Sequence, residues 1–370
     1  MREAIALDRQ MKSCFKMPFR HTPRAFTAIK LIAFLAFGTH FGLVSPSWAA
    51  PQGQLQDKDK AEVRLPERTA DEWLQRMQGA THRRSYVGTF VVSSAGGLYS
   101  SRIWHVCDGA QQVERVESLT GIPRSTFRRN DDVVTFQPLT RIARIEKREA
   151  SGLFPNLNQI DGASVAEFYS AKAVALDRTA GFDADVVQFA PKDKLRFGYL
   201  IWSERKTGLV IKAQTLDLEG RVIEQSAFSE LVLDASVKPD RLVQMMNHTE
   251  GYKVEKPEVI KTTAAAEGWH LKSAVAGFKP VSCFKRLPEN KALGDGALQW
   301  IFSDGLASVS LFVETFDRQR HLQESLRSMG ATQTLTRHLR EGAGEWWLTV
   351  MGEVPTQTLL SFAQSLERKK

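Results

Sequence analysis

Cysteine is scarce in this sequence, with three residues in 370. Cys14 precedes the longest apolar run, while Cys107 and Cys283 stand far apart in the remainder of the chain. This small number excludes a disulfide-dense scaffold, and no Cys-x-x-Cys pair is present to hold zinc. Cys107 and Cys283 could form a bridge in an oxidising compartment, but two unpaired, buried thiols are the interpretation that we favour.

The sequence also lacks the motifs of the common enzyme classes. It has no Gly-x-Ser-x-Gly elbow, no His-Glu-x-x-His, no phosphate-binding loop and no complete dinucleotide fingerprint. The closest carboxylate pairs, Asp131 with Asp132 and Asp183 with Asp185, fall at expected turns, where aspartate is common for conformational reasons. Six histidines are dispersed without the spacing of metal ligands: His82, His105, His248, His270, His321 and His338. We therefore expect neither catalysis nor a cofactor or metal.

One long apolar run is present, and it lies near the N-terminus. Residues 31–44 follow a basic stretch and precede Ser47-Trp48-Ala49, which has signal-peptidase spacing. The run is shorter than the roughly 20 residues that span a bilayer. We interpret residues 1–49 as a Sec-type signal peptide that is cleaved near Ala49 or Ala50 and directs the chain to the periplasm. A membrane anchor is the alternative.

The excess of basic charge is concentrated in this leader. The whole chain has a formal net charge of +8, but residues 50–370 carry 43 Lys and Arg against 40 Asp and Glu, which leaves +3. An exported chain with nearly balanced charge does not have the basic composition of a nucleic-acid binder. We therefore expect no nucleic-acid partner.

The order of the elements expected in the first half indicates one domain over residues 67–235. Residues 50–66 are polar and are interpreted as a flexible mature N-terminus. Thr69 and Glu72 fit a capping box, which predicts a helix over 70–81. Residues 154–175 are rich in alanine and are expected to add another helix. Ten short strands joined by turns are predicted at 86–92, 99–107, 111–118, 125–129, 133–137, 141–147, 184–190, 197–203, 209–216 and 222–228.

A second domain is expected over residues 265–370. Residues 236–264 contain two prolines and many charges and are interpreted as a linker. Asp304-Gly305 stands between two apolar runs and predicts a hairpin turn. A helix is expected over 317–329, and Pro355 is expected to open a last helix whose buried face is Leu359, Phe362, Ala363 and Leu366. Strands are predicted at 281–285, 298–303, 307–314, 332–338 and 345–352.

Apolar and basic side chains on the strands of the first domain form the candidate binding surface. Such apolar residues usually belong to a core, but a half-closed sheet under a helical lid can leave a cavity for acyl chains or an apolar peptide. Neighbouring arginines would suit the phosphates of an anionic amphiphile. The candidate lipid-binding residues are Phe90, Ile103, Trp104, Phe127, Phe136, Tyr199, Ile201, Trp202, Arg115, Arg124 and Arg128.

Several stretches, taken in order, resemble the MucB/RseB family. They are residues 85–91 (SYVGTFV), 102–105 (RIWH), 114–124 (ERVESLTGIPR), 197–202 (FGYLIW) with 207–210 (TGLV), 301–310 (IFSDGLASVS) and 350–358 (VMGEVPTQT). The resemblance extends from about residue 68 to residue 368. It implies an α+β fold in which a curved antiparallel half-barrel with covering helices, like that of the LolA/LolB carriers, precedes a smaller α+β domain.

The resemblance also implies a regulatory role without enzymatic activity. Members of the family bind the periplasmic part of a membrane-bound RseA- or MucA-type anti-sigma factor and protect it from site-1 proteolysis. They thereby restrain an envelope-stress sigma factor of the sigma-E or AlgU type until lipopolysaccharide or another acylated ligand releases them. The alternative function is that of a periplasmic lipid or lipoprotein carrier of the LolA/LolB type. The residues that contact the partner stay unknown, and a homo-oligomer is left open.

Overall fold

The computed structural model describes residues 65–107, 109, 111–147, 165–287, 296–341 and 344–369. The predicted signal peptide and nearly all of the predicted flexible segment lie outside these residues. In the described part of the chain, no helix combines the length and apolar character needed to cross a membrane.

Helix α2 (Ala70–Arg83) begins at the predicted capping box. The Thr69 hydroxyl accepts a hydrogen bond from the Glu72 amide at 3.2 Å, and the Glu72 carboxylate accepts one from the Thr69 amide at 2.7 Å. These bonds satisfy amides that the first turn leaves without an intrahelical acceptor. Trp73, Leu74 and Met77 are buried along one side of the helix. The predicted helix is confirmed, and it extends two residues beyond the predicted end.

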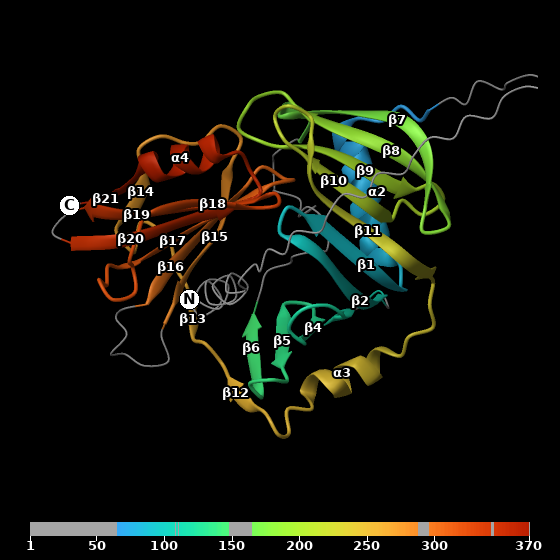
Figure 1. Cartoon of the computed structure of the whole chain (residues 1–370), viewed down its shortest axis with the longest axis horizontal. Helices are drawn as coiled ribbons and strands as arrows, with labels where there is room; N and C mark the ends of the chain where they lie inside the picture. The colour runs from blue at the N-terminus through green and yellow to red at the C-terminus, as the bar shows by residue number, and fades with distance from the viewer. Residues whose placement is uncertain are drawn as a thin grey trace, which may run out of the picture. The chain divides into compact units, whose positions relative to one another are not determined.

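A twelve-stranded sheet accounts for most of residues 86–255 (Figure 1). All ten strands predicted in this half are confirmed, and β1 pairs with β11, so the first and second runs of strands form one sheet. All its pairings are antiparallel except that of β12 with β6. The order is β12-β6-β5-β4-β3-β2-β1-β11-β10-β9-β8-β7. The strands are β1 (Tyr86–Ser94), β2 (Gly97–Cys107), β3 (Gln112–Ser118), β4 (Ser125–Arg129), β5 (Asp132–Gln137), β6 (Ile142–Lys147), β7 (Tyr169–Thr179), β8 (Phe182–Pro191), β9 (Gly198–Glu204), β10 (Val210–Leu216), β11 (Val222–Leu233) and β12 (Lys253–Glu255).

The predicted helix over 154–175 is wrong for its described part. Residues 151–164 lie outside the described residues, Val165–Glu167 forms a single 3-10 turn, and β7 begins at Tyr169. Tyr169 and Ala173 are buried, and the strand pairs with β8 along its whole length. Pairing with a neighbouring strand and burial of alternate side chains outweigh the weak intrinsic helix preference of the alanines.

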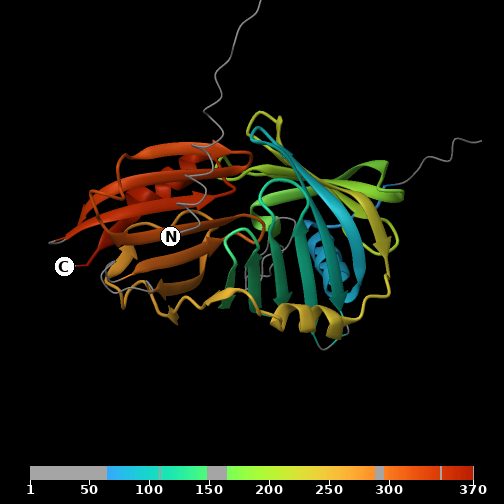
Figure 2. The same ribbon diagram turned by 60° about the horizontal axis from the view of Figure 1, so that its bottom comes forward.

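Two helices cover opposite faces of the large sheet, α2 on one face and α3 (Pro239–Asn247) on the other (Figure 2). The consecutive residues Ile103 and Trp104 of β2 show this, because successive side chains of a strand point to opposite faces. Ile103 belongs to the cluster that contains Ala80 of α2, whereas Trp104 packs against the cluster that contains Leu242 of α3. The segment interpreted as a linker thus contains a packed helix and the short strands β12 and β13 (Val259–Lys261).

A seven-stranded antiparallel sheet forms the second half of the fold, in the order β13-β15-β16-β17-β20-β19-β18. Helix α4 (Thr356–Ser365) follows Pro355 as predicted, and Leu359, Phe362 and Ala363 are buried in the core of this sheet. Leu366 is also buried but lies just beyond the helix. The remaining strands are β14 (Trp269–Leu271), which pairs with β21 (Leu366–Arg368), β15 (Lys279–Arg286), β16 (Ala297–Ser303), β17 (Ser308–Thr315), β18 (Ser325–Met329), β19 (Thr332–Glu341) and β20 (Gly344–Gly352). All five strands predicted here are confirmed.

The predicted helix over 317–329 is wrong. Asp317 instead holds a local turn, in which its carboxylate accepts the Gln319 amide at 2.9 Å and its own amide donates to Nδ1 of His321 at 2.9 Å. Residues 325–329 then form the edge strand β18, which pairs with β19. Aspartate commonly competes with helix formation through such side-chain bonds to the nearby backbone.

Candidate functional site

Five of the eight apolar candidate residues lie in two buried clusters that include residues of α2. Tyr199 and Ile201 pack with Trp73 and Met77 of α2, and both are almost fully buried. Phe90, Ile103 and Trp202 belong to a neighbouring cluster with Ala80. The indole nitrogen of Trp202 also donates to the Asp177 carboxylate at 2.7 Å.

The other three apolar candidates lie on the opposite face, under α3. Phe127 and Phe136 pack edge to face, with ring centroids 5.7 Å apart, against Met246 of α3. Trp104 packs beside them against Leu242. The structure therefore divides the eight apolar candidates between two faces of one sheet. Phe90, Ile103, Tyr199 and Ile201 lie on the face that α2 covers. Trp202 follows Ile201 directly on β9, so its side chain points to the other face, where the Lys212 ammonium lies 3.9 Å from its ring centroid. In this structure, these side chains belong to or pack against the hydrophobic core.

The three candidate arginines have separate surroundings. The Arg115 guanidinium lies 4.7 Å from the ring centroid of Trp104 and donates to Ser125 at 3.2 Å, while Glu117 pairs with it at 3.0 Å. Arg128 donates to the Asn130 carbonyl oxygen at 2.8 Å, and Arg124 is exposed. The arginines thus do not converge on a single anion site within the described residues.

A polar hollow of about 390 Å³ lies at the end of β2 and β3. His82, Cys107, Gln112, Arg128 and Asp131 are among the residues that line it. The hollow has room for a small polar molecule. Its lining contains none of the predicted apolar residues.

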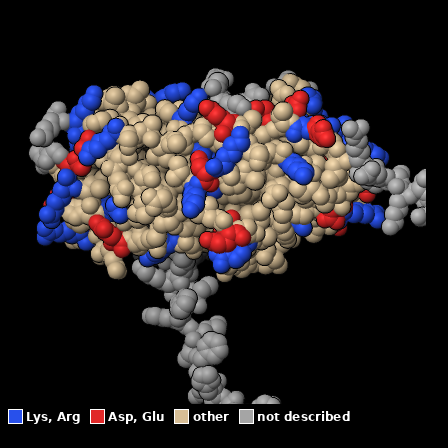
Figure 3. All heavy atoms as spheres, turned by 90° about the horizontal axis from the view of Figure 1, so that it is seen from above, with Lys and Arg blue, Asp and Glu red and all other residues tan. Residues whose placement is uncertain are grey.

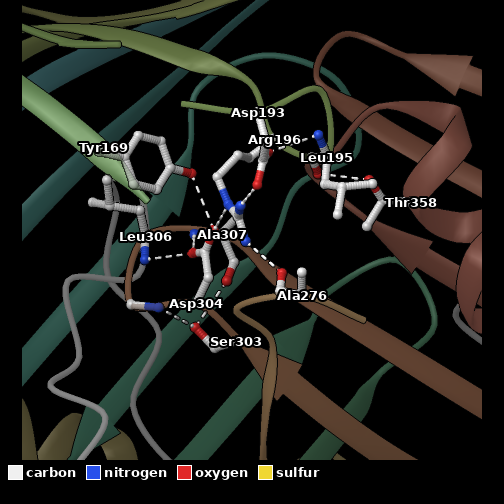
Figure 4. Close-up of polar contacts among 11 residues, drawn as sticks. Tyr169, Asp193, Leu195, Arg196, Ala276, Ser303, Asp304, Leu306, Ala307 and Thr358 are labelled. Carbon is white, nitrogen blue, oxygen red and sulfur yellow. Dashed lines mark hydrogen bonds and ion pairs between the residues drawn. The ribbon is translucent and has the colours of Figure 1, made fainter. Parts of the chain in front are cut away.

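A buried ion pair that the sequence did not reveal joins the two halves of the fold. Arg196, from the segment between β8 and β9, places its Nε 2.7 Å from Oδ2 of Asp304, which begins the turn between β16 and β17. Both side chains are fully buried. Figure 4 shows how Tyr169 and the Ala276 carbonyl oxygen complete the network. Tyr169 donates to Asp304 at 3.2 Å, and Arg196 donates to Ala276 at 2.8 Å.

Asp304 also shapes its own turn. Its Oδ1 accepts the amides of Leu306 at 2.9 Å and Ala307 at 2.7 Å. Gly305 has a φ of +100°, and a Cβ there would lie 2.7 Å from Cγ2 of Val165. One side chain therefore both forms the predicted Asp-Gly hairpin and binds Arg196. The sequence predicted the Asp304-Gly305 turn but not the ion pair, because Arg196 and Asp304 are 108 positions apart and no local pattern links them.

A second contact between the two sheets contains two acidic residues, Glu224 and Glu353. Glu224 of β11 accepts the backbone amide of Ala331, between β18 and β19, at 3.2 Å. Loss of hydration on burial, together with the nearby Glu224 charge, raises the pKa of Glu353 to about 7. The pKa of Tyr199 is raised well above its usual value by burial and by the Glu353 charge, and its hydroxyl has no partner in the described structure.

The two cysteines in the described structure are unpaired, as predicted. Cys283 is buried as expected, but Cys107 is only partly buried. No cluster of three or more His, Cys, Asp or Glu side chains suited to a metal ion occurs among the described residues. On the face of the molecule in Figure 3, basic and acidic residues both occur, with uncharged surface between them.

Two family models match the chain. The model of the MucB/RseB N-terminal domain matches residues 69–246, and that of the MucB/RseB C-terminal domain matches residues 263–367. Together they cover most of the sequence and nearly all of the described residues.

Curated relatives match over the same length. The sigma factor AlgU regulatory protein MucB of Pseudomonas aeruginosa is 28% identical over 302 residues, which cover 80% of this chain and 90% of that protein. The sigma-E factor regulatory protein RseB of Haemophilus influenzae is 24% identical over 305 residues, which cover 81% of this chain and 92% of that protein.

Solved structures show the same fold. The crystal structure of MucB in complex with MucA(peri) is 25% identical, superimposes with a TM-score of 0.62, and the match covers 81% of this chain and 99% of that chain. A crystal structure of MucB alone superimposes with a TM-score of 0.58 at 22% identity.

Proposed function

The chain belongs to the MucB/RseB family, and from that premise we propose that it is a regulatory protein that binds the periplasmic region of a membrane-bound anti-sigma factor. The observation that carries this proposal is the match to MucB in complex with MucA(peri), which extends over 99% of that chain and over both halves of this one. The named relatives are regulators of sigma factors, which supports a function in binding.

Binding would act on the stability of the anti-sigma factor. In the proposed mechanism, the bound protein shields the periplasmic segment from site-1 proteolysis and so restrains the envelope-stress sigma factor. Lipopolysaccharide or another acylated ligand would then release it. Two ligands that exclude each other weaken each other's binding by the same factor. The release can therefore be measured as a fall in affinity for the anti-sigma factor when lipopolysaccharide is added, or as a fall in affinity for lipopolysaccharide when the anti-sigma factor is added.

Each half of the chain has a proposed role. Residues 67–235 form a LolA/LolB-like domain that senses lipid or peptide, residues 236–264 act as a linker, and residues 265–370 bind the partner. Most of the apolar candidate contacts are buried under α2 or α3, so an acyl chain would reach them only by displacing a helix. The free-energy cost of displacing a helix must be offset by new apolar contacts with the acyl chain. A ligand shifts a conformational equilibrium only as far as its affinities for the two conformations differ. Action in the periplasm rests on the signal peptide at residues 1–49, outside the described residues.

Calorimetric titration of the mature chain with the purified periplasmic region of a MucA- or RseA-type anti-sigma factor from the same organism tests the proposal. We expect a stoichiometric complex whose apparent affinity falls as lipopolysaccharide is added. The absence of any complex would refute the regulatory function. A complex whose affinity is unchanged at saturating lipopolysaccharide would refute only the release mechanism.

The alternative function, a lipid or lipoprotein carrier, draws on the same large sheet with its helix-covered apolar faces. A carrier has to move acyl chains between membranes without the anti-sigma factor. The full mature chain is the right reagent, because removal of the second half would leave Arg196 buried without Asp304. Catalytic transfer of a fluorescent acylated probe between two vesicle populations would favour the carrier.

A further inference from the structure

Cys107 is part of a hydrogen-bonded cluster at the end of β2. Nε2 of His105 lies 3.2 Å from the Cys107 sulfur and 3.0 Å from the carbonyl oxygen of Thr81 in α2. Nδ1 of the same ring lies 3.1 Å from Oε2 of Glu114 on β3. A thiol, an imidazole and a carboxylate are therefore connected in that order, which is the arrangement that activates a cysteine nucleophile in proteins.

The imidazole carries a positive charge at neutral pH. Burial by itself would lower the pKa of His105, but its hydrogen bonds with Cys107 and Glu114 outweigh burial and raise the pKa to about 9. Tyr86 stacks on the ring with centroids 4.8 Å apart and fixes its orientation. The Cys107 sulfur thus lies beside a charged imidazole and 3.7 Å from the Thr81 carbonyl oxygen, which gives its proton a nearby acceptor.

The sulfur is also accessible from one side. Cys107 is partly buried and lines the polar hollow of about 390 Å³ together with His82, Gln112 and Arg128. The other cysteine is in a different environment, because Cys283 is buried in the core of the second sheet. Burial, with a contribution from the charge of Glu267, raises the pKa of the Cys283 thiol to about 11.

We propose that Cys107 is a reactive thiol that forms a mixed disulfide with a low-molecular-weight disulfide held in the adjacent hollow, with His105 and Glu114 as positioning residues. This inference is independent of the proposed binding of an anti-sigma factor. It identifies a modification site at one of the two unpaired thiols of the described residues.

The reaction is a balanced exchange. The Cys107 thiolate attacks one sulfur of the small disulfide, a new sulfur–sulfur bond forms, and the original sulfur–sulfur bond breaks. The other half of the reagent leaves as a thiolate and takes a proton from water. Cys107 is oxidised, the released half is reduced, and no further oxidant is required.

The test uses the full mature chain and oxidised glutathione, with intact mass and peptide mapping as the readout. We expect one glutathione per chain, attached at Cys107 and removed by dithiothreitol. Cys107→Ser should abolish the addition, whereas the matched variant Cys283→Ser should react at the wild-type rate. Attachment mainly at Cys283, or at both cysteines at equal rates, would overturn the proposal.

The role of the cluster is tested by Glu114→Gln, which keeps the shape of the side chain and removes its charge. We expect Glu114→Gln to slow the addition of glutathione at pH 7 by about tenfold and to lower the pH at which the His105 ring titrates, because the imidazole loses its charged partner. Glu117→Gln, the same change on the same strand, should leave both the rate and the His105 midpoint as in the wild type. A wild-type rate in Glu114→Gln would show that the cluster does not activate Cys107.

Discussion

Arg196 and Asp304 are 108 residues apart in the sequence, yet their side chains form a fully buried ion pair with 2.7 Å between Nε and Oδ2. The pair joins the segment between β8 and β9 to the β16–β17 turn. Asp193 also pairs with Arg196, and Tyr169, Ala276 and the turn amides supply further partners, so the two charges do not lack partners in the core. A pair of this kind specifies one arrangement of the elements that it connects, since any other arrangement would leave buried charges without partners.

Removal of one member of this pair should destabilise the whole chain. We expect Asp304→Asn to lower the free energy of unfolding by about 1.5–3 kcal/mol, because Arg196 then loses its fully buried carboxylate partner and keeps only the partly exposed Asp193. Urea denaturation followed by circular dichroism measures the change. The exposed pair of Arg84 and Asp234 is the control, and Asp234→Asn should cost less than about 1 kcal/mol. Equal effects of the two variants would contradict the structural role given to Asp304.

Glu353 should make stability depend on pH near neutrality. Its pKa in the folded chain is about 7, above the ordinary value of 4.5, so the folded state binds the proton more tightly. The stability that this protonation contributes is complete below pH 4.5, decreases as the pH rises, and is lost above about pH 7. The decrease amounts to about 3 kcal/mol at most. Glu353→Gln should remove it.

Thermal denaturation of the wild type and of Glu353→Gln between pH 4.5 and 8 measures this difference. The exposed Glu230 lies on the same strand as Glu224, and Glu230→Gln is the matched control, which should follow the wild-type curve. A wild-type curve that is parallel to that of Glu353→Gln throughout would show that Glu353 does not hold its proton in the folded chain.

His105 should remain protonated well above the usual range for histidine. Its pKa of about 9 is above the ordinary value of 6.5, so its contribution to stability is complete below pH 6.5 and is lost as the pH rises through 9. Nuclear magnetic resonance of the histidine ring protons reports this directly. We expect the His105 signal to stay nearly constant from pH 6 to 8. A midpoint near 6.5 would contradict the ion pair with Glu114.

Phe127 tests whether the candidate lipid-binding residues are core residues in the resting state. It is 3% exposed and packs against Phe136 and Met246. We expect Phe127→Ala to lower the free energy of unfolding by about 3–5 kcal/mol. Leu139→Ala, at a residue that is 71% exposed, should change it by less than about 0.5 kcal/mol. A variant at Phe127 that is as stable as the wild type would indicate an open lipid site instead of a core.

The local signals in the sequence were sufficient for most elements. The capping box at Thr69, the Asp304-Gly305 turn and the Pro355 helix start each depend on residues within four positions, and the structure has all three. Prediction failed where local preference competed with strand pairing. Residues 169–175 and 325–329 are strands because a neighbouring strand supplies their hydrogen bonds. The residues within each segment do not indicate which strand will pair with it.

By itself, the sequence determined the family, most strands of both sheets and the starts of α2 and α4, because these follow from the order and spacing of nearby residues. The expected α+β class is corrected to a mostly β fold, since two of the predicted helices are absent from the described residues and strands occupy their positions. Only the tertiary structure decided that Ile103 and Trp104 lie under different helices, that Arg196 binds Asp304 and that His105 connects Cys107 with Glu114. The physical reason is that burial and charge pairing depend on distances in space, and these are set by how the strands pair and not by how far apart the residues stand in the chain.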